Sequence, residues 1–197
     1  MNKITEDNLI KKIAQGDELA FNEIYSLYRN RVYGFIYRMT INKTLAEDIT
    51  HETFMVLIEH PARYRTERGG SLLTFLCAVA RKQVMNHLRR KHNSDVGFDE
   101  IENFDSLEDE TRENPLSNLL NQELAAQIDA CVAALPPLQR EVIVLREYEE
   151  LSYEEIARVT ESELGSVKAR LHRARQTLAK QLAAYIASAK DKCYEVH

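Results

Sequence analysis

One stretch of this chain cannot fold by itself, and it divides the sequence in two. Residues 93–122 carry nine acidic side chains and a single arginine, Arg112, which gives the stretch a net charge of −8. The same stretch contains Gly97 and Pro115 and few apolar residues, so it cannot bury enough surface to offset the entropy lost on ordering. We therefore expect an acidic linker over 93–122 between a domain at 1–92 and a second at 123–185, with a tail at 186–197.

Basic residues concentrate on either side of this linker. Residues 63–92 contain eight lysines and arginines and one acid, Glu67, for a net charge of +7. Residues 166–180 contain five bases and no acid, although the whole chain has a net charge of −5 at pH 7. Two basic surfaces joined by an acidic tether indicate two contacts with nucleic acid, or one contact with the tether acting as a mimic of nucleic acid. The alternative for each basic run is a solvated charged face.

The apolar residues of the first half repeat at helical spacing. Three stripes are present: Leu19, Ile24, Leu27 and Tyr28, continuing into Val32, Phe35, Ile36 and Met39; Leu45, Ile49, Phe54, Leu57 and Ile58; and Leu72, Leu76, Val79, Val84 and Leu88. Pro61 and the Gly69-Gly70 pair separate the helices, and the hydroxyl of Ser71 can accept a bond from the free amides of the third helix.

The second half shows the same spacing, so we predict an all-α fold with a helical domain on either side of the linker. One helix ends at Pro136-Pro137, and Pro137 can begin the next. Ser152 and Glu155 then form a capping box, in which each side chain satisfies the other residue's backbone amide. A final long helix carries its apolar face on Val167, Leu171, Ala174, Leu178, Leu182 and Tyr185.

Several classes of protein lack their signature in this chain. Cys77, Cys131 and Cys193 are scattered, without a CxxC pair, which is typical of packing residues rather than of disulfides or a zinc site. No GxxxxGK, HExxH or GxSxG motif occurs, so we predict neither an enzyme nor a site for a cofactor or metal. Apolar stretches such as 72–80 run about half the ~20 residues that cross a bilayer, and the N-terminus has no signal-peptide pattern. We expect a cytoplasmic protein without membrane insertion.

Residues 152–175 have the pattern of a helix-turn-helix. Ala157 is the small residue that the crossing of the two helices needs, and Val167 anchors the second helix in the core. The exposed face of the second helix could then enter a major groove. The turn between the two helices usually has glycine at the position of Glu161, because that position tends to need positive φ. Glutamate there has some conformational cost. Spacing alone leaves an ordinary α-hairpin with a basic face as the alternative.

Residues 135–178 resemble region 4 of the sigma-70 family, specifically the short group called extracytoplasmic function sigma factors. The matched features are Leu135-Pro136, the run Ser-Tyr-Glu-Glu-Ile-Ala at 152–157, and the segment from Gly165 to Arg175. The resemblance implies that this domain reads the −35 promoter element with its second helix, in which Lys168, His172 and Arg173 stand at base-facing positions. The predicted −35 contacts are Ser166, Lys168, His172, Arg173 and Arg175.

The first half resembles region 2 of the same family. Residues 20–39 are similar to its opening helix. Residues 46–54 are similar to the helix that docks on the clamp coiled coil of the largest polymerase subunit, with His51 where the family usually has Gln. Asp48 and Glu52 are four residues apart, so they share one helix face and can pair with a basic partner. The resemblance assigns Asp48, Glu52 and Phe54 to polymerase binding, with a solvated acidic face as the alternative.

Residues 73–81 resemble the promoter-melting helix of the family, with Phe75 where Trp is usual; a core position is the alternative for Phe75. Opening DNA requires a positive surface for the backbone and stacking faces or pockets for the freed bases. The resemblance implies that the loop between Pro61 and Ser71 captures a flipped base of the −10 element. The predicted −10 contacts are Arg63, Tyr64, Arg81, Asn86, His87, Arg89 and Arg90.

The resemblance covers roughly residues 20–180 in the family's own order. It implies three partners: core RNA polymerase, promoter DNA in double- and single-stranded form, and an anti-sigma protein. It also implies that the linker threads through the polymerase, with a passive spacer as the alternative. A freestanding helix-turn-helix regulator would not need residues 46–54. A polymerase-sequestering module would leave both basic surfaces unexplained. We therefore predict a sigma factor that binds core polymerase and directs promoter-specific initiation.

Overall fold

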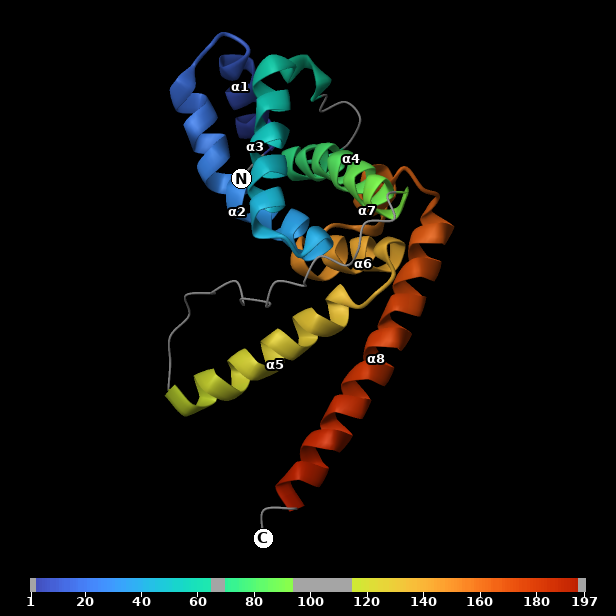
Figure 1. The fold of residues 1–197 in the computed structure, drawn as a ribbon. Helices are drawn as coiled ribbons and strands as arrows, with labels where there is room; N and C mark the ends of the chain where they lie inside the picture. The colour runs from blue at the N-terminus through green and yellow to red at the C-terminus, as the bar shows by residue number, and fades with distance from the viewer. Residues whose placement is uncertain (1–2, 65–69, 94–114, 195–197) are drawn as a thin grey trace.

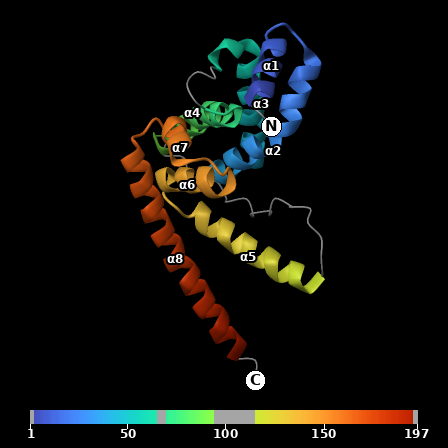
Figure 2. The same ribbon diagram turned by 180° about the vertical axis from the view of Figure 1, so that it is seen from behind.

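The computed structural model describes residues 3–64, 70–93 and 115–194, which are mostly helical and contain no strand. The elements are α1 (Lys3–Ile13), α2 (Glu18–Thr40), α3 (Lys43–Glu59), the 3-10 turn η1 (Pro61–Arg63), α4 (Leu72–Asn93), α5 (Pro115–Ala133), α6 (Pro137–Ile143), the π-helical turn η3 (Val144–Tyr148), α7 (Tyr153–Thr160) and α8 (Leu164–Tyr194). α1 to α3 lie at one end of the molecule, and α5 and the far half of α8 lie at the other (Figures 1 and 2). The predicted all-α fold is confirmed. None of the helices in the described ranges has the length and apolar character needed to cross a membrane.

The helix starts that the sequence predicts are present. Ser71 accepts a bond from the backbone amide of Thr74 at 3.2 Å, in the first turn of α4. The hydroxyl of Ser152 accepts from the amide of Glu155 at 3.2 Å, and the Glu155 carboxylate accepts from the amide of Ser152 at 2.9 Å. α6 begins at Pro137. Each of these caps uses chemistry within four residues of the helix end, which explains why sequence alone could place it.

Several boundaries and stripe positions differ from the prediction. α5 begins at Pro115, inside the predicted linker, and α8 continues to Tyr194, past the predicted domain end at 185. Three predicted stripe residues are exposed, namely Leu19 (81%), Leu27 (47%) and Ile58 (40%), because α2 and α3 bury only the sides that face their neighbours. Positions 94–114 of the predicted linker and 65–69 of the predicted base-capturing loop lie outside the described residues.

The two halves of the chain pack directly against each other. α4, from before the acidic segment, lies along α7, from after it (Figure 1), and α2 also contacts α5, α6 and η3. Buried side chains from both halves, among them Ile36, Leu76, Leu145 and Ile156, belong to one continuous apolar cluster. The regions flanking the acidic segment therefore share a core in this structure. This packing determines which of the predicted contact residues are available at the surface.

Candidate polymerase and nucleic-acid interfaces

The acidic face of α3 is open to solvent. Asn42 begins the helix by accepting a bond from the amide of Leu45 at 2.8 Å. The buried face of α3 is apolar apart from two threonines, and each threonine hydroxyl donates to the backbone carbonyl four residues before it. Asp48 and Glu52 lie on the other side of α3 and are exposed. The structure thus presents both predicted docking acids together on a helix whose opposite face is held by the core.

Phe54, the third predicted polymerase contact, lies in that core instead. Its side chain is 1% exposed. Its ring packs edge-on against Tyr25, with ring centroids 4.9 Å apart, and against Phe21 at 6.4 Å. In this conformation Phe54 cannot contact a partner, and its role is to hold α3 against α2.

Of the seven predicted −10 residues, four lie on the exposed side of α4, one is exposed in η1, and two are not exposed. Asn86, His87, Arg89 and Arg90 are exposed on the second half of the helix, and Arg63 is exposed in η1. Tyr64 is only 8% exposed, and its ring packs edge-on against Phe75 with centroids 5.8 Å apart. Arg81 is half-buried and bound to an acid from the other half of the chain. Phe75 itself packs against the core, which supports the interpretation of this position as structural.

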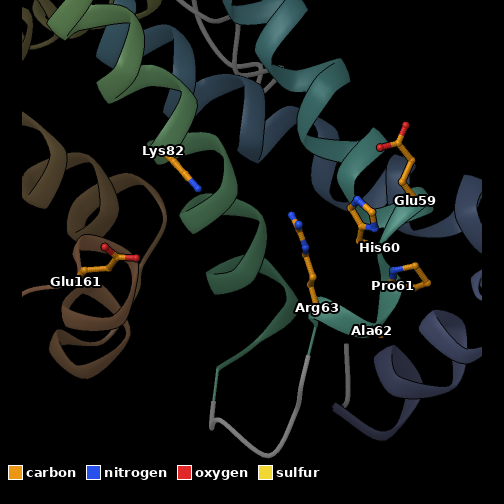
Figure 3. Close-up of a pocket in the computed structure, with 7 residues that line it drawn as sticks. All are labelled: Glu59, His60, Pro61, Ala62, Arg63, Lys82 and Glu161. Carbon is orange, nitrogen blue, oxygen red and sulfur yellow. The ribbon is translucent and has the colours of Figure 1, made fainter.

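An open groove runs between η1 and α4 (Figure 3). Its lining residues are Glu59, His60, Pro61, Ala62, Arg63, Lys82 and Glu161. Arg63 and Lys82 point into the same space from the two walls, and Glu161 at the end of α7 lies across α4 from them. Lys82 was not among the predicted −10 contacts, although it belongs to the basic run 63–92. The groove brings two cations together, with Glu59 and Glu161 also in its lining, and the two cations are the groups that suit a phosphate of a nucleic-acid strand.

The helix-turn-helix has the predicted geometry. Ile156 and Val159 of α7 are buried against Val167, Leu171 and Ala174 of α8. The predicted −35 residues lie on the opposite side of α8 and are exposed, namely Ser166, Lys168, His172, Arg173 and Arg175. Arg175 also forms an ion pair with Glu147 at 2.7 Å. The first turns of α8 therefore present a polar and basic face outward, as a helix that enters a major groove must.

Glu161 has the left-handed conformation that the turn requires, with φ 50° and ψ 42°. A non-glycine residue pays a steric cost there that glycine avoids. We expect Glu161→Gly to raise the free energy of unfolding by about 0.5–1 kcal/mol, measured by urea denaturation. Glu154→Gly is the matched control, because Glu154 is exposed within α7, where glycine should lower stability by about 1 kcal/mol. If Glu161→Gly instead lowers the free energy of unfolding, the glutamate side chain stabilises the protein by more than the left-handed backbone conformation destabilises it.

A buried carboxylate joins the two basic helices. Glu141 in α6 is 0% exposed, and its Oε2 accepts a bond from Nε of Arg81 in α4 at 2.7 Å. Its Oε1 accepts from Arg170 in α8 at 3.3 Å. Burial raises the pKa of Glu141, and the two arginines oppose that rise. Arg81 and Arg170 thus have a shared anionic partner in this arrangement.

Comparison with known proteins was made for both halves. Residues 24–94 match the family described as "Sigma-70 region 2", and residues 125–178 match "Sigma-70, region 4". The chain is 30% identical over 184 residues to the RNA polymerase sigma-H factor of Pseudomonas aeruginosa, covering 90% of this chain and 93% of that protein. It is 31% identical over 183 residues to the ECF RNA polymerase sigma-E factor of Haemophilus influenzae, covering 89% and 94%.

This chain belongs to the sigma-70 family. Its relatives place it in the extracytoplasmic function group, and it directs promoter-specific transcription initiation with RNA polymerase. Two solved structures share the fold of this sigma factor. The sigma factor RpoE in complex with the anti-sigma factor NepR from Bartonella quintana aligns with a TM-score of 0.66 at 23% identity, covering 83% of this chain and 96% of that one. CnrH in complex with the cytosolic domain of CnrY aligns with a TM-score of 0.65 at 19% identity, covering 91% and 98%.

Further polar contacts connect region 2 and region 4 of this sigma factor. Arg31 in α2 pairs with Glu149 at 3.1 Å and donates to its backbone carbonyl at 2.6 Å. The guanidinium of Arg38 stacks on the Tyr148 ring, 3.9 Å from its centroid. Tyr148 is the last residue of the π-helical turn η3, and Glu149 follows it directly. Both arginine contacts are therefore made where η3 ends, before α7 begins. Burial raises the pKa of Glu149, while Arg31 lowers it.

Arg140 in α6 binds backbone carbonyls near the ends of two helices, one from each half of the chain. It donates to the carbonyl of Met39 near the end of α2 at 3.0 Å, and to the carbonyls of Ala133 and Leu135 at the end of α5. Carbonyls at helix ends lack partners within the helix, so this one guanidinium satisfies groups that would otherwise require water. Burial lowers the pKa of Arg140.

Sequence reasoning did not identify Glu141, Arg140 or Arg31 as contact residues. Glu141 stands at the head of the apolar run 142–145, and an acid directly before buried positions was the only local signal for it. Its partner Arg81 is 60 residues away in the sequence. No periodicity within α4 or α6 could have indicated that pairing.

Proposed function

We propose that this sigma factor uses three separate surfaces to bind polymerase, the −10 region and the −35 element. The exposed acidic face of α3, with Asp48 and Glu52, binds core RNA polymerase. The basic side of α4, with Lys82, Asn86, His87, Arg89 and Arg90, contacts the −10 region together with Arg63 of η1, and α8 reads the −35 element. The protein acts in the cytoplasm, performs no catalysis itself, and leaves RNA synthesis to the polymerase.

The observation that supports this proposal is that exposed acidic and exposed basic side chains lie on different helices, each of which packs against the core. Asp48 and Glu52 are exposed on α3, and Lys168, His172 and Arg173 are exposed on α8. Carboxylates suit a basic partner helix, whereas arginine and lysine suit phosphates and guanine edges. A freestanding regulator would account for α8 alone.

We further propose that an anti-sigma protein holds this chain inactive. Of the two solved structures with the same fold, RpoE was obtained in complex with the anti-sigma factor NepR, and CnrH in complex with the cytosolic domain of CnrY. In this protein Arg81 is already engaged by Glu141 across the two halves, so a partner that stabilises this packing would keep a −10 residue from DNA. Co-purification from native cells that recovers polymerase and no other specific protein would count against this proposal.

The experiment that tests the function is run-off transcription across a genome, using core polymerase with and without the protein. We expect new transcripts to begin at a fixed distance from a shared two-part motif. Lys168→Glu with Arg173→Glu should reduce transcription from these promoters by about a hundredfold or more, because two cations facing DNA become anions.

The matched control is Lys11→Glu with Lys12→Glu, since both lysines are exposed on α1 and the net charge changes equally. Undiminished transcription by the α8 variant would contradict the −35 assignment. No transcript from the wild-type protein, with core polymerase active under another sigma factor, would instead favour a sequestering module.

A further inference from the structure

A buried acid outside the region 2 match joins three parts of that domain. Glu6 in α1 is 4% exposed. Its Oε1 accepts a bond from the Tyr28 hydroxyl of α2 at 2.5 Å. Its Oε2 accepts from the backbone amide of Leu72, the first residue of α4, at 3.2 Å, and from the Tyr64 hydroxyl at 3.5 Å. One carboxylate therefore holds the residue that ends η1 and the residue that begins α4.

These contacts connect Glu6 to the two elements between which the groove of Figure 3 lies. The walls of the groove are η1, which carries Arg63, and α4, which carries Lys82. Tyr64 follows Arg63 directly, and Leu72 begins the helix on which Lys82 stands. Because the Glu6 carboxylate binds both Tyr64 and Leu72, it links the residue that follows η1 to the first residue of α4.

The chemistry of this link favours a fixed geometry. A negative charge at a helix N-terminus satisfies a free amide and interacts favourably with the helix dipole. Burial and the bond to Glu6 raise the pKa of Tyr28, so this hydroxyl stays protonated and donates. The Tyr64 ring also packs on Phe75 of α4, with centroids 5.8 Å apart, which leaves the tyrosine little freedom to move.

We propose that Glu6 is a positioning residue for the −10 contact: it sets the separation of η1 and α4, and so the spacing of Arg63 and Lys82 that the single-stranded promoter DNA meets. This inference rests on the −10 assignment under the proposed function. Glu6 itself does not touch DNA. It acts through Tyr64 and Leu72 on the elements that carry the two cations.

The test measures how tightly holoenzyme, formed from the full chain and core polymerase, binds a single-stranded oligonucleotide carrying the −10 motif of the promoters found by run-off transcription. Glu6→Gln keeps the size of the side chain but removes its charge. We expect it to weaken oligonucleotide binding about five- to tenfold, the effect of losing one hydrogen bond of ordinary strength. Affinity for core polymerase and for −35 duplex should stay unchanged, because the hydrogen-bond partners of Glu6 are Tyr28, Tyr64 and Leu72, and none of them belongs to α3 or α8.

Two comparison variants separate positioning from general stability. Ile13→Ala removes a buried side chain from the same helix and leaves the carboxylate in place. Tyr28→Phe removes one bond to Glu6 and keeps the bonds to Leu72 and Tyr64. Both should bind the oligonucleotide within about twofold of the wild type at temperatures where they are folded. Equal weakening by Ile13→Ala and Glu6→Gln would reduce Glu6 to a stabilising residue and overturn the inference.

Arg63→Ala separates the role of Glu6 from the contact between the groove and the −10 strand. If Arg63→Ala weakens binding and Glu6→Gln does not, the inference about Glu6 is wrong and the groove assignment stands. If neither change weakens binding, the groove does not contact the −10 strand, and the assignment under the proposed function is wrong as well.

Discussion

Glu141→Ala should lower the free energy of unfolding by about 3 kcal/mol, at the lower end of what the loss of one partner of a buried ion pair costs. Glu141 is fully buried, and its removal leaves Arg81 and Arg170 without their shared acceptor; their side chains are 17% and 21% exposed. Because both arginines keep this contact with water, we expect the decrease in the free energy of unfolding to lie near the lower end of that range. Urea denaturation followed by circular dichroism measures it directly.

Glu147→Ala is the matched control. Glu147 also pairs with an arginine of α8, Arg175, at the same 2.7 Å that separates Arg81 from Glu141, but both members of that pair are about half exposed. Exposed ion pairs contribute about 0–1 kcal/mol, so this variant should lose less than about 1 kcal/mol. Similar losses in the two variants would mean that the Glu141 cluster contributes no more than a surface pair.

Asp48→Lys with Glu52→Lys should weaken binding to core polymerase by about a hundredfold or more, since placing like charges across an interface costs several kcal/mol. Both side chains are exposed, so the substitutions leave the core of region 2 intact. The double variant should keep the thermal stability of the wild type and the affinity of α8 for −35 duplex. Fluorescence anisotropy of the labelled protein titrated with core polymerase gives the affinity.

Glu23→Lys with Glu154→Lys makes the same change in net charge at exposed positions of α2 and α7 instead of α3. This control should bind polymerase within about threefold of the wild type. Unchanged polymerase affinity in the α3 variant would remove the docking assignment. Equal weakening by both double variants would indicate an effect of overall charge rather than of a particular face.

Features that depend on neighbouring residues could be predicted from sequence. Ser71, the capping box of Ser152 and Glu155, and the left-handed Glu161 all follow from the chemistry of a few adjacent positions. The exposed acids of α3 and the exposed bases of α8 follow from helical periodicity. These local signals were sufficient for the all-α fold and for most of the surface residues.

Features that depend on distant partners could not be predicted. Tyr64 and Arg81 have residue types suited to DNA, yet one is buried beside Glu6 and the other binds Glu141. The acidic composition of 93–122 indicated a boundary, but composition carries no information about how the two halves face each other. Glu6 was missed because its partners Tyr28, Tyr64 and Leu72 are 22, 58 and 66 residues away.

The two oxygens of Glu155 serve different structures. Oε2 belongs to the capping box and binds the amide and hydroxyl of Ser152, each at 2.9 Å. Oε1 accepts from the hydroxyl of Thr74 in α4 at 3.0 Å. If regions 2 and 4 separate, water can replace the Thr74 hydroxyl, while the start of α7 keeps its own cap. The cap at the start of α7 therefore does not depend on the contact with region 2, whereas the Thr74 bond does.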